Sequence, residues 1–185
     1  ARAAEVIIRE VDRLNRVISQ LLEFARPVAM DLKPTSLPAL VRHAVRMVEA
    51  EARQKAIVIE AALDAAIGES PLLLDADRMT QVFLNLYLNA IAAMDAGGVL
   101  RVSLAVQDAG SVRVAVADTG IGIPKDALTR IFDPYFTTRS SGTGLGLAIV
   151  QKIVEAHGGE VHLESEPGRG TTAGIVLPTE TEKRG

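Results

Sequence analysis

The sequence predicts an α/β sandwich in which helices cover one face of a sheet. Two amphipathic helical patterns, at about 37–54 and 77–94, alternate with strand-like runs that come in antiparallel pairs. The pairs are 99–107 with 111–118, and about 160–165 with 172–177. The chain has 185 residues, 48% of them hydrophobic, which is enough for one domain with its own core and an appendage. Helices mixed with hairpins in this way favour helices gathered on one sheet face.

The first 27 residues predict a helix with a narrow apolar seam. Apolar residues recur at alternating spacings of four and three, the heptad rule of a coiled coil or bundle: Ile7, Val11, Leu14, Ile18, Leu21 and Ala25. Pro27 ends the helix because it disfavours the α conformation in the residue before it. A helix lying on its own domain fits this pattern. Half of a helical hairpin, whose partner helix is missing or comes from another chain, fits the strict seam better.

Residues 28–36 predict a linker, and residues 37–185 predict one folded domain. The linker carries Pro34 and ends at Ser36, whose hydroxyl can cap a helix that begins at Leu37. After that helix we expect a β-rich run at 57–59, the second long helix, and a hairpin with its turn at 108–110. A third helix from about 143 to 157, stopped by two glycines, precedes the closing strands.

Composition excludes several classes of function. The formal net charge of −3 does not provide the excess of positive charge that attracts a polyanion, so we expect no nucleic-acid partner. The absence of cysteine excludes disulfides, thiolate metal sites and thiol catalysis. No apolar run is long enough to span a bilayer. We expect a cytoplasmic segment of a longer protein, because the amphipathic pattern is in phase from its first turn; the parent is either cytoplasmic or anchored in the inner membrane.

Two glycine-rich turns bracket the aromatic run Ile131-Phe-Asp-Pro-Tyr-Phe136. The first, Asp118-Thr-Gly-Ile-Gly-Ile-Pro124, follows a strand, and the second, Gly142-Thr-Gly-Leu-Gly-Leu147, precedes a helix. Glycines at these places let a ligand approach backbone N–H groups and the positive end of a helix, which suits phosphate oxygens. The spacing is neither that of a Walker loop nor that of the dinucleotide fingerprint. The pair of turns predicts a nucleotide pocket with a lid.

Three polar side chains could complete this pocket. Asn85 and Asn89 lie one helical turn apart within an apolar stretch, and a carboxamide oxygen is a ligand suited to Mg²⁺; the alternative is that they face solvent. Asp118 could accept a hydrogen bond from the exocyclic amine of adenine, or shape its loop as an Asx turn, or do both. Arg139 could reach a terminal phosphate, or be an ordinary solvated arginine.

In their order along the chain, these motifs resemble those of sensor histidine kinases. Asn85-Leu-Tyr-Leu-Asn89, Asp118-Thr-Gly-Ile-Gly122, Phe132-Asp-Pro-Tyr-Phe136 and Gly142-Thr-Gly-Leu-Gly146 resemble the family's N box, first glycine box, F box and second glycine box. Residues 10–27 resemble the second helix of the dimerisation and phosphotransfer hairpin. The short lid is similar to that of the nitrogen-regulation branch. Four ordered motifs make the resemblance specific.

The resemblance implies a Bergerat-type (GHKL/HATPase) α/β sandwich, a mixed sheet packed on helices, that binds ATP and Mg²⁺. It implies Asn89 on the metal with Asn85 beside it, Asp118 on the adenine amine, Gly120 and Gly122 beside the base, and Phe132 and Phe136 anchoring the lid. Thr171 or Thr172 assists near the adenine. The implied site further includes Ile123, Arg139, Gly142, Thr143, Gly144, Leu145, Gly146 and Leu147. The implied partners are a response regulator and a second copy of the kinase, joined through the N-terminal helix.

Two features narrow the implied reaction. The family's phosphoacceptor histidine lies in a box on the first hairpin helix, and none of His43, His157 and His162 stands in such a box. Asn85 occupies the place where related hydrolytic ATPases carry a glutamate that activates water, and an amide cannot accept that proton at neutral pH. The sequence therefore predicts transfer of the γ-phosphate to a histidine outside it. The alternatives are an ATP-hydrolysing relative of the same fold, and a dimeric interaction module that binds no nucleotide.

Overall fold

The computed structural model describes residues 11, 18, 21–22, 29–64, 67, 71–108, 110–139 and 142–179. The predicted N-terminal helix lies outside the described residues except at four positions. These four, Val11, Ile18, Leu21 and Leu22, are helical, and their side chains are 40% to 57% exposed. The role of this helix in a dimer stays a prediction. Within the described residues, no helix combines the length and apolar character needed to cross a membrane.

The main sheet is mixed. Its five strands stand in the order β2-β4-β5-β7-β6, and β2 pairs parallel with β4 while the other neighbours pair antiparallel. The strands are β2 (Val58–Leu63), β4 (Val99–Asp108), β5 (Ser111–Asp118), β6 (Glu160–Glu166) and β7 (Gly170–Pro178). The predicted hairpin and closing strands are confirmed, and the expected run at 57–59 is the start of a longer strand.

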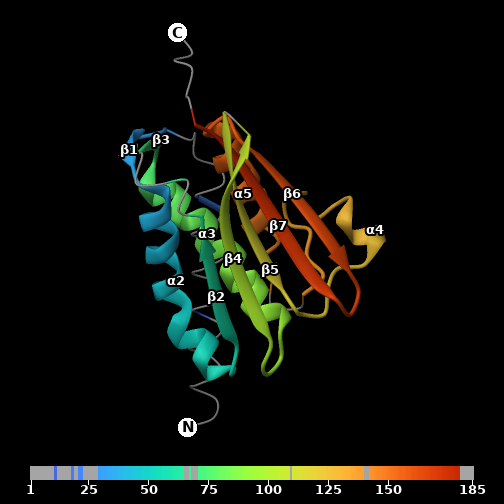
Figure 1. Ribbon diagram of the computed structural model, residues 1–185. Helices are drawn as coiled ribbons and strands as arrows, with labels where there is room; N and C mark the ends of the chain where they lie inside the picture. Colours follow the sequence, from blue (N-terminus) through green and yellow to red (C-terminus); the bar gives the residue numbers. More distant parts are fainter. Residues whose placement is uncertain are drawn as a thin grey trace.

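Three helices cover one face of this sheet (Figure 1). They are α2 (Leu37–Gln54), α3 (Ala76–Ala93) and α5 (Gly146–Ala156); the four-residue α4 (Lys125–Leu128) lies beside β6 in the segment between the glycine turns. Ser36 caps α2, since its hydroxyl accepts a hydrogen bond from the Ala39 N–H at 3.3 Å. The start expected near residue 143 was three residues early, because Gly144 has a φ of 71° and a helix cannot pass through it.

A second, two-stranded sheet is present that the sequence patterns do not predict. Its strands are β1 (Lys33–Thr35) and β3 (Leu72–Leu74), which pair antiparallel with Lys33 opposite Leu74. Strands of three residues are too short to show an alternating pattern, so only the pairing identifies them. Part of the predicted linker thus pairs with the domain, and the exact domain boundary stays a prediction.

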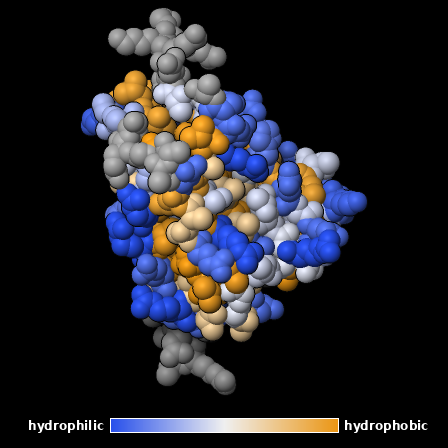
Figure 2. All heavy atoms as spheres, viewed as in Figure 1, coloured by the Kyte–Doolittle hydropathy of each residue, from blue (hydrophilic) through white to orange (hydrophobic). Residues whose placement is uncertain are grey.

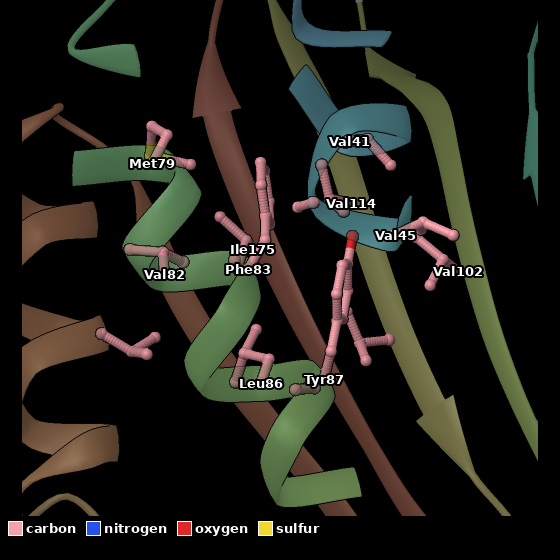
Figure 3. Packing of buried hydrophobic residues seen from close by; sticks show 14 of the residues in the cluster. Val41, Val45, Met79, Val82, Phe83, Leu86, Tyr87, Val102, Val114 and Ile175 are labelled. Atoms are coloured by element: carbon pink, nitrogen blue, oxygen red, sulfur yellow. The ribbon is translucent and has the colours of Figure 1, made fainter. Parts of the chain in front are cut away.

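The core lies between the helices and the sheet. Phe83 and Tyr87 of α3 are fully buried, with stacked rings 6.2 Å apart, and face Ile175 of β7 and Val114 of β5 (Figure 3). Val45 of α2 closes the same cluster. Viewed as in Figure 1, the surface shows hydrophobic residues in the middle, with hydrophilic residues on either side (Figure 2). One buried face and one accessible face are usual for sheets with antiparallel pairs.

Candidate nucleotide-binding site

One pocket, of about 500 Å³, lies where α3, α5 and the ends of β5 and β7 meet. The segment between the two glycine turns forms its remaining wall. A volume of this size suits a ligand as large as a nucleotide. Most of the predicted site residues line it: Asn85, Asn89, Asp118, Gly122, Ile123, Phe136, Arg139, Gly142, Thr143, Gly144, Gly146 and Leu147.

At one end of the pocket, α3 faces the beginning of α5. A Cβ atom added to Gly146, the first residue of α5, would lie 3.5 Å from Asn85 Oδ1 and 3.8 Å from Asn89 Nδ2. Asn85 is half-buried, Asn89 is exposed, and both residues line the pocket. Neither side-chain amide makes a hydrogen bond within the described part of the chain. This end of the pocket therefore has free polar groups directed toward a ligand.

The first turn of α5 adds backbone donors to the same end. Among the described residues, no side chain caps this helix, and its first turn contains no acidic residue. Its leading N–H groups and the positive helix end are therefore available to an anion. Leu145 is fully buried and does not line the pocket, so its side chain anchors the turn in the core. Arg139 crosses the pocket from the other wall and donates a hydrogen bond to the Asn89 carbonyl oxygen at 3.4 Å.

At the other end, Asp118 forms the expected Asx turn, and its expected hydrogen bond with an adenine amine stays a prediction. Its Oδ1 accepts a hydrogen bond from the Gly120 N–H at 2.8 Å, which is the Asx turn, and the carboxylate also lines the pocket. Burial raises the pKa of Asp118 above its ordinary value, and hydrogen bonds from the Gly120 and Thr171 N–H groups and the charge of Arg139 oppose that shift. The carboxylate is thus a partly desolvated acceptor aimed into the pocket.

Gly120 does not line the pocket, although the resemblance placed it beside the base. A Cβ at this residue would lie 2.6 Å from the Ala93 carbonyl oxygen, so the missing side chain lets the turn pack against the end of α3. Ile121 then donates a backbone hydrogen bond to that same oxygen at 3.1 Å. Gly122 does line the pocket, and its φ of 69° and the adjacent Glu166 carbonyl require glycine there.

Strand alternation determines which of the two threonines faces the pocket. Thr171 lines the pocket and Thr172 does not, because Ala173, Ile175 and Leu177 show that odd-numbered residues of β7 point toward the helices. The same alternation was present in the sequence and could have selected Thr171. Ser165 of β6 was missed entirely: its hydroxyl accepts a hydrogen bond from the Ile123 N–H at 2.8 Å and contacts Thr171 Oγ1 at 2.9 Å.

Of the two aromatic residues expected to anchor the segment between the glycine turns, one lines the pocket. Phe136 lines the pocket, with the guanidinium of Arg130 4.5 Å from its ring centroid. Phe132 is half-buried and is not among the lining residues, whereas its neighbour Ile131 is buried and lines the wall. Phe136 and Ile131 of the aromatic run therefore reach the pocket, and the anchoring of a lid by Phe132 and Phe136 stays a prediction.

The three histidines lie away from this pocket's lining. His43 is exposed on α2. His162 is exposed and lies 3.1 Å from Glu160 Oε2, a carboxylate two residues away that the alternation of β6 brings to the same face. His157 is buried at the end of α5, where Nε2 accepts a hydrogen bond from the Asp75 N–H at 3.0 Å and Nδ1 lies 2.8 Å from the Ile153 carbonyl oxygen. Burial lowers the pKa of His157, so it is neutral there and does not act as a positive charge at the helix end.

The chain belongs to the family of histidine kinase-, DNA gyrase B- and HSP90-like ATPases, whose family model matches residues 74–181. It is similar to the sensor histidine kinase ZraS of Escherichia coli strain K12, with 42% identity over 181 residues that cover 98% of this chain and 38% of ZraS. The chain thus spans about two fifths of the length of this curated relative.

Two solved histidine kinase structures have the same fold. One is full-length ShkA in complex with AMPPNP, with a TM-score of 0.84 and 32% identity over 98% of this chain and 39% of that chain. The other is histidine kinase ThkA in complex with the response regulator protein TrrA, with a TM-score of 0.83 and 29% identity over 100% of this chain and 52% of that chain. The predicted family and fold are confirmed: the chain carries a histidine kinase-type ATP-binding catalytic domain.

Proposed function

We propose that this chain binds Mg²⁺-ATP and donates the γ-phosphate to a histidine outside its own sequence, as the catalytic part of a two-component sensor histidine kinase. The observation that carries the proposal is one pocket with Asn85, Asn89 and the uncapped start of α5 at one end, and the acceptor Asp118 at the other. The first end suits phosphates and the second suits an amine on a purine base.

The donor set fits a magnesium ion that is held mainly by the nucleotide. Within the described ranges, no three His, Cys, Asp or Glu residues cluster as a metal site. Mg²⁺ usually takes few protein ligands alongside waters and substrate phosphates, and Asn89 offers a free carboxamide oxygen in the pocket. When bound, the cation neutralises phosphate charge. Asn89 would hold it, with Asn85 one turn away, and Arg139 would add positive charge at the same end.

The reaction proposed is transfer, because nothing at Asn85 can activate water as a base. Phosphoryl transfer depends mainly on positioning and charge neutralisation, which the two asparagines, the α5 N–H groups and Arg139 would supply. His157 is buried, and His43 and His162 do not line the pocket. We therefore infer that the acceptor histidine lies outside this sequence, on the first helix of the hairpin whose second helix residues 10–27 resemble.

We also propose that the parent protein has two partners, a response regulator and a second copy of itself, and that this domain works in the cytoplasm. The complex of ThkA with a response regulator supports a response regulator as the receiver of the phosphoryl group. The apolar seam predicted for residues 7–25, with Val11 and Ile18 exposed, supports a homodimer formed through this helix in the parent protein. The domain itself would work in the cytoplasm, where ATP and Mg²⁺ are plentiful.

Nucleotide titration tests the binding step. We expect the chain to bind an ATP analogue with Mg²⁺, and Asn89→Ala to weaken that binding at least about tenfold while removing its Mg²⁺ dependence, since interactions with charged groups carry this much energy. Gln81→Ala, on the same helix but outside the pocket lining, is the matched control. Equal binding by wild type and Asn89→Ala, or no binding at all, would refute the proposal.

A second experiment tests the transfer step. A separate fragment that carries the family's first hairpin helix should become phosphorylated on histidine when mixed with this chain and Mg²⁺-ATP. Steady phosphate release by the chain alone would instead favour the hydrolytic alternative. A demonstrated complex that transfers no phosphate would contradict the proposed catalytic role.

A further inference from the structure

Two hydroxyl groups meet beside the Asp118 end of the pocket. Ser165 of β6 and Thr171 of β7 are register partners, and their hydroxyl oxygens lie 2.9 Å apart. Ser165 Oγ also lies 2.9 Å from the Gly170 carbonyl oxygen and 2.8 Å from the Ile123 nitrogen. Thr171 lines the pocket, whereas Ser165 does not. Ser165 therefore has three polar neighbours within the protein, and its own side chain does not line the pocket.

The chemistry of these neighbours assigns the hydroxyl protons. A hydroxyl donates one hydrogen bond and accepts up to two, while a carbonyl oxygen can only accept. The Ser165 hydroxyl must donate its hydrogen bond to the Gly170 carbonyl oxygen. One of its lone pairs accepts the hydrogen bond from the Ile123 N–H. The remaining lone pair faces Thr171, which must therefore donate. The reverse assignment would leave Ser165 and the Gly170 oxygen as two acceptors 2.9 Å apart.

This assignment determines what Thr171 offers a ligand. Its proton is engaged by Ser165, so the hydroxyl presents lone pairs alone to the pocket. Asp118 stands opposite Thr171 in the strand register and lines the same end, and an ionised carboxylate also only accepts. Asp118 and Thr171, which are paired across β5 and β7 and both line the pocket, are thus both acceptors.

We propose that Ser165 is a positioning residue for purine specificity: by holding the Thr171 proton, it keeps the base end of the pocket acceptor-only. Such an end matches a purine that offers an amine and repels one that offers a carbonyl oxygen. The inference rests on the proposed nucleotide binding. It assigns Ser165 a role that acts through Thr171 without contact to the nucleotide.

Dissociation constants for ATP and for inosine triphosphate, in which a carbonyl oxygen replaces the exocyclic amine, test the proposal. In Ser165→Ala, the Thr171 proton is free to turn into the pocket and donate to the carbonyl oxygen. The preference for ATP should fall about twofold to tenfold, the factor of one hydrogen bond, mainly through tighter binding of inosine triphosphate. Ser165→Thr, which keeps a hydroxyl, should restore the preference. Thr172→Val, on the other face of β7, should leave it unchanged.

A double-mutant cycle separates this role from a general loss of stability. In a Thr171→Val background the preference should no longer respond to Ser165→Ala, because no hydroxyl is left to reorient. Additive effects, or an unchanged preference in Ser165→Ala, would overturn the positioning role and leave the proposed function standing. A wild type that binds ATP without preference over inosine triphosphate would also overturn it. If neither nucleotide binds, both proposals fail.

Discussion

The two ends of the pocket are built in different ways. At the base end, Asp118, Ser165 and Thr171 are hydrogen-bonded to the protein itself. At the phosphate end, Asn85 and Asn89 have no side-chain hydrogen bonds within the described residues, and α5 begins without a side-chain cap. Under the proposed function, the base end is preorganised to discriminate between purines, whereas the phosphate end is completed by its ligand. Substitutions at the two ends should therefore differ in their effects on the free energy of unfolding and on nucleotide affinity.

The largest effect is expected at the phosphate end from Gly144→Ala. Gly144 has a φ of 71°, and an added Cβ would collide with the Tyr135 backbone and lie 2.7 Å from the Phe136 nitrogen. Shifting that wall should lower the free energy of unfolding by about 3 kcal/mol and weaken nucleotide binding by more than about tenfold. Thermal unfolding and nucleotide titration measure the two effects.

Gly168→Ala is the matched control for this change. Gly168 has nearly the same φ, 78°, but nothing lies within 4 Å of its added Cβ. Gly168→Ala should lower the free energy of unfolding only by the strain of a left-handed residue, about 1 kcal/mol, and should leave nucleotide affinity unchanged. Equal losses in the two variants would show that backbone strain alone, and not the contact with the lid, requires glycine at position 144.

At the base end, Asp118→Asn should separate affinity from stability. The amide oxygen can still accept the Gly120 hydrogen bond, but the NH₂ group turns part of an acceptor site into a donor. ATP affinity should fall about tenfold to a hundredfold, as expected for a lost charged hydrogen bond. The same titrations should show a smaller preference over inosine triphosphate.

The stability of Asp118→Asn should move in the other direction. Burial raises the pKa of Asp118 above 3.8, so the folded state binds a proton more tightly than the unfolded state, and the carboxyl lowers stability as pH rises through the range just above 3.8. At neutral pH the variant should therefore be at least as stable as wild type in denaturant unfolding. A clearly less stable variant would mean that the carboxylate is needed for the fold of the turn.

A smaller effect is expected at the far end of α5, where His157 ties that helix to Asp75 at the start of α3. The folded-state pKa of His157 lies below its ordinary value of 6.5, so the unfolded state takes up the proton first. The stability that this residue contributes is present above pH 6.5 and is lost as pH falls below it, by up to about 1.4 kcal/mol per pH unit.

Denaturant unfolding between neutral and mildly acidic pH measures this slope. His157→Gln cannot titrate but can still accept the Asp75 hydrogen bond, so its stability should change less with pH. His43→Gln, an exposed histidine on α2, should behave like wild type. The same slope in all three proteins would assign the pH dependence to other groups.

The smallest effect is expected on the core face of α3, opposite the asparagines. The hydroxyl of Tyr87 is buried, points toward α2, and has no hydrogen-bond partner among the described residues (Figure 3). Burial raises its pKa well above the ordinary value, so it stays neutral. Tyr87→Phe removes a polar atom without a partner, and the free energy of unfolding should rise by up to about 1 kcal/mol. Nucleotide affinity should not change; a loss of stability would reveal a partner for the hydroxyl.

Local patterns in the sequence were enough to predict the main helices and strands and the candidate ligand-binding residues. Amphipathic helical patterns and strand periodicity located α2, α3 and the two hairpins, and Asn85, Asn89 and Asp118 could be chosen because they interrupt or end apolar patterns. The glycine turns were also visible, since glycine stands where a chain needs positive φ or close backbone contact. These signals are local, so each is complete within a few residues.

The contacts between distant residues of the pocket become visible only in the folded chain. Folding brought Ser165 to Ile123, packed Gly120 on the end of α3, and carried Arg139 across to Asn89. It also buried His157 against Asp75 and joined β1 to β3. Such contacts depend on strand register and helix packing between segments far apart in the chain, and no local pattern records them. The sequence therefore identified the pocket, and the packing decided which atoms it presents to a ligand.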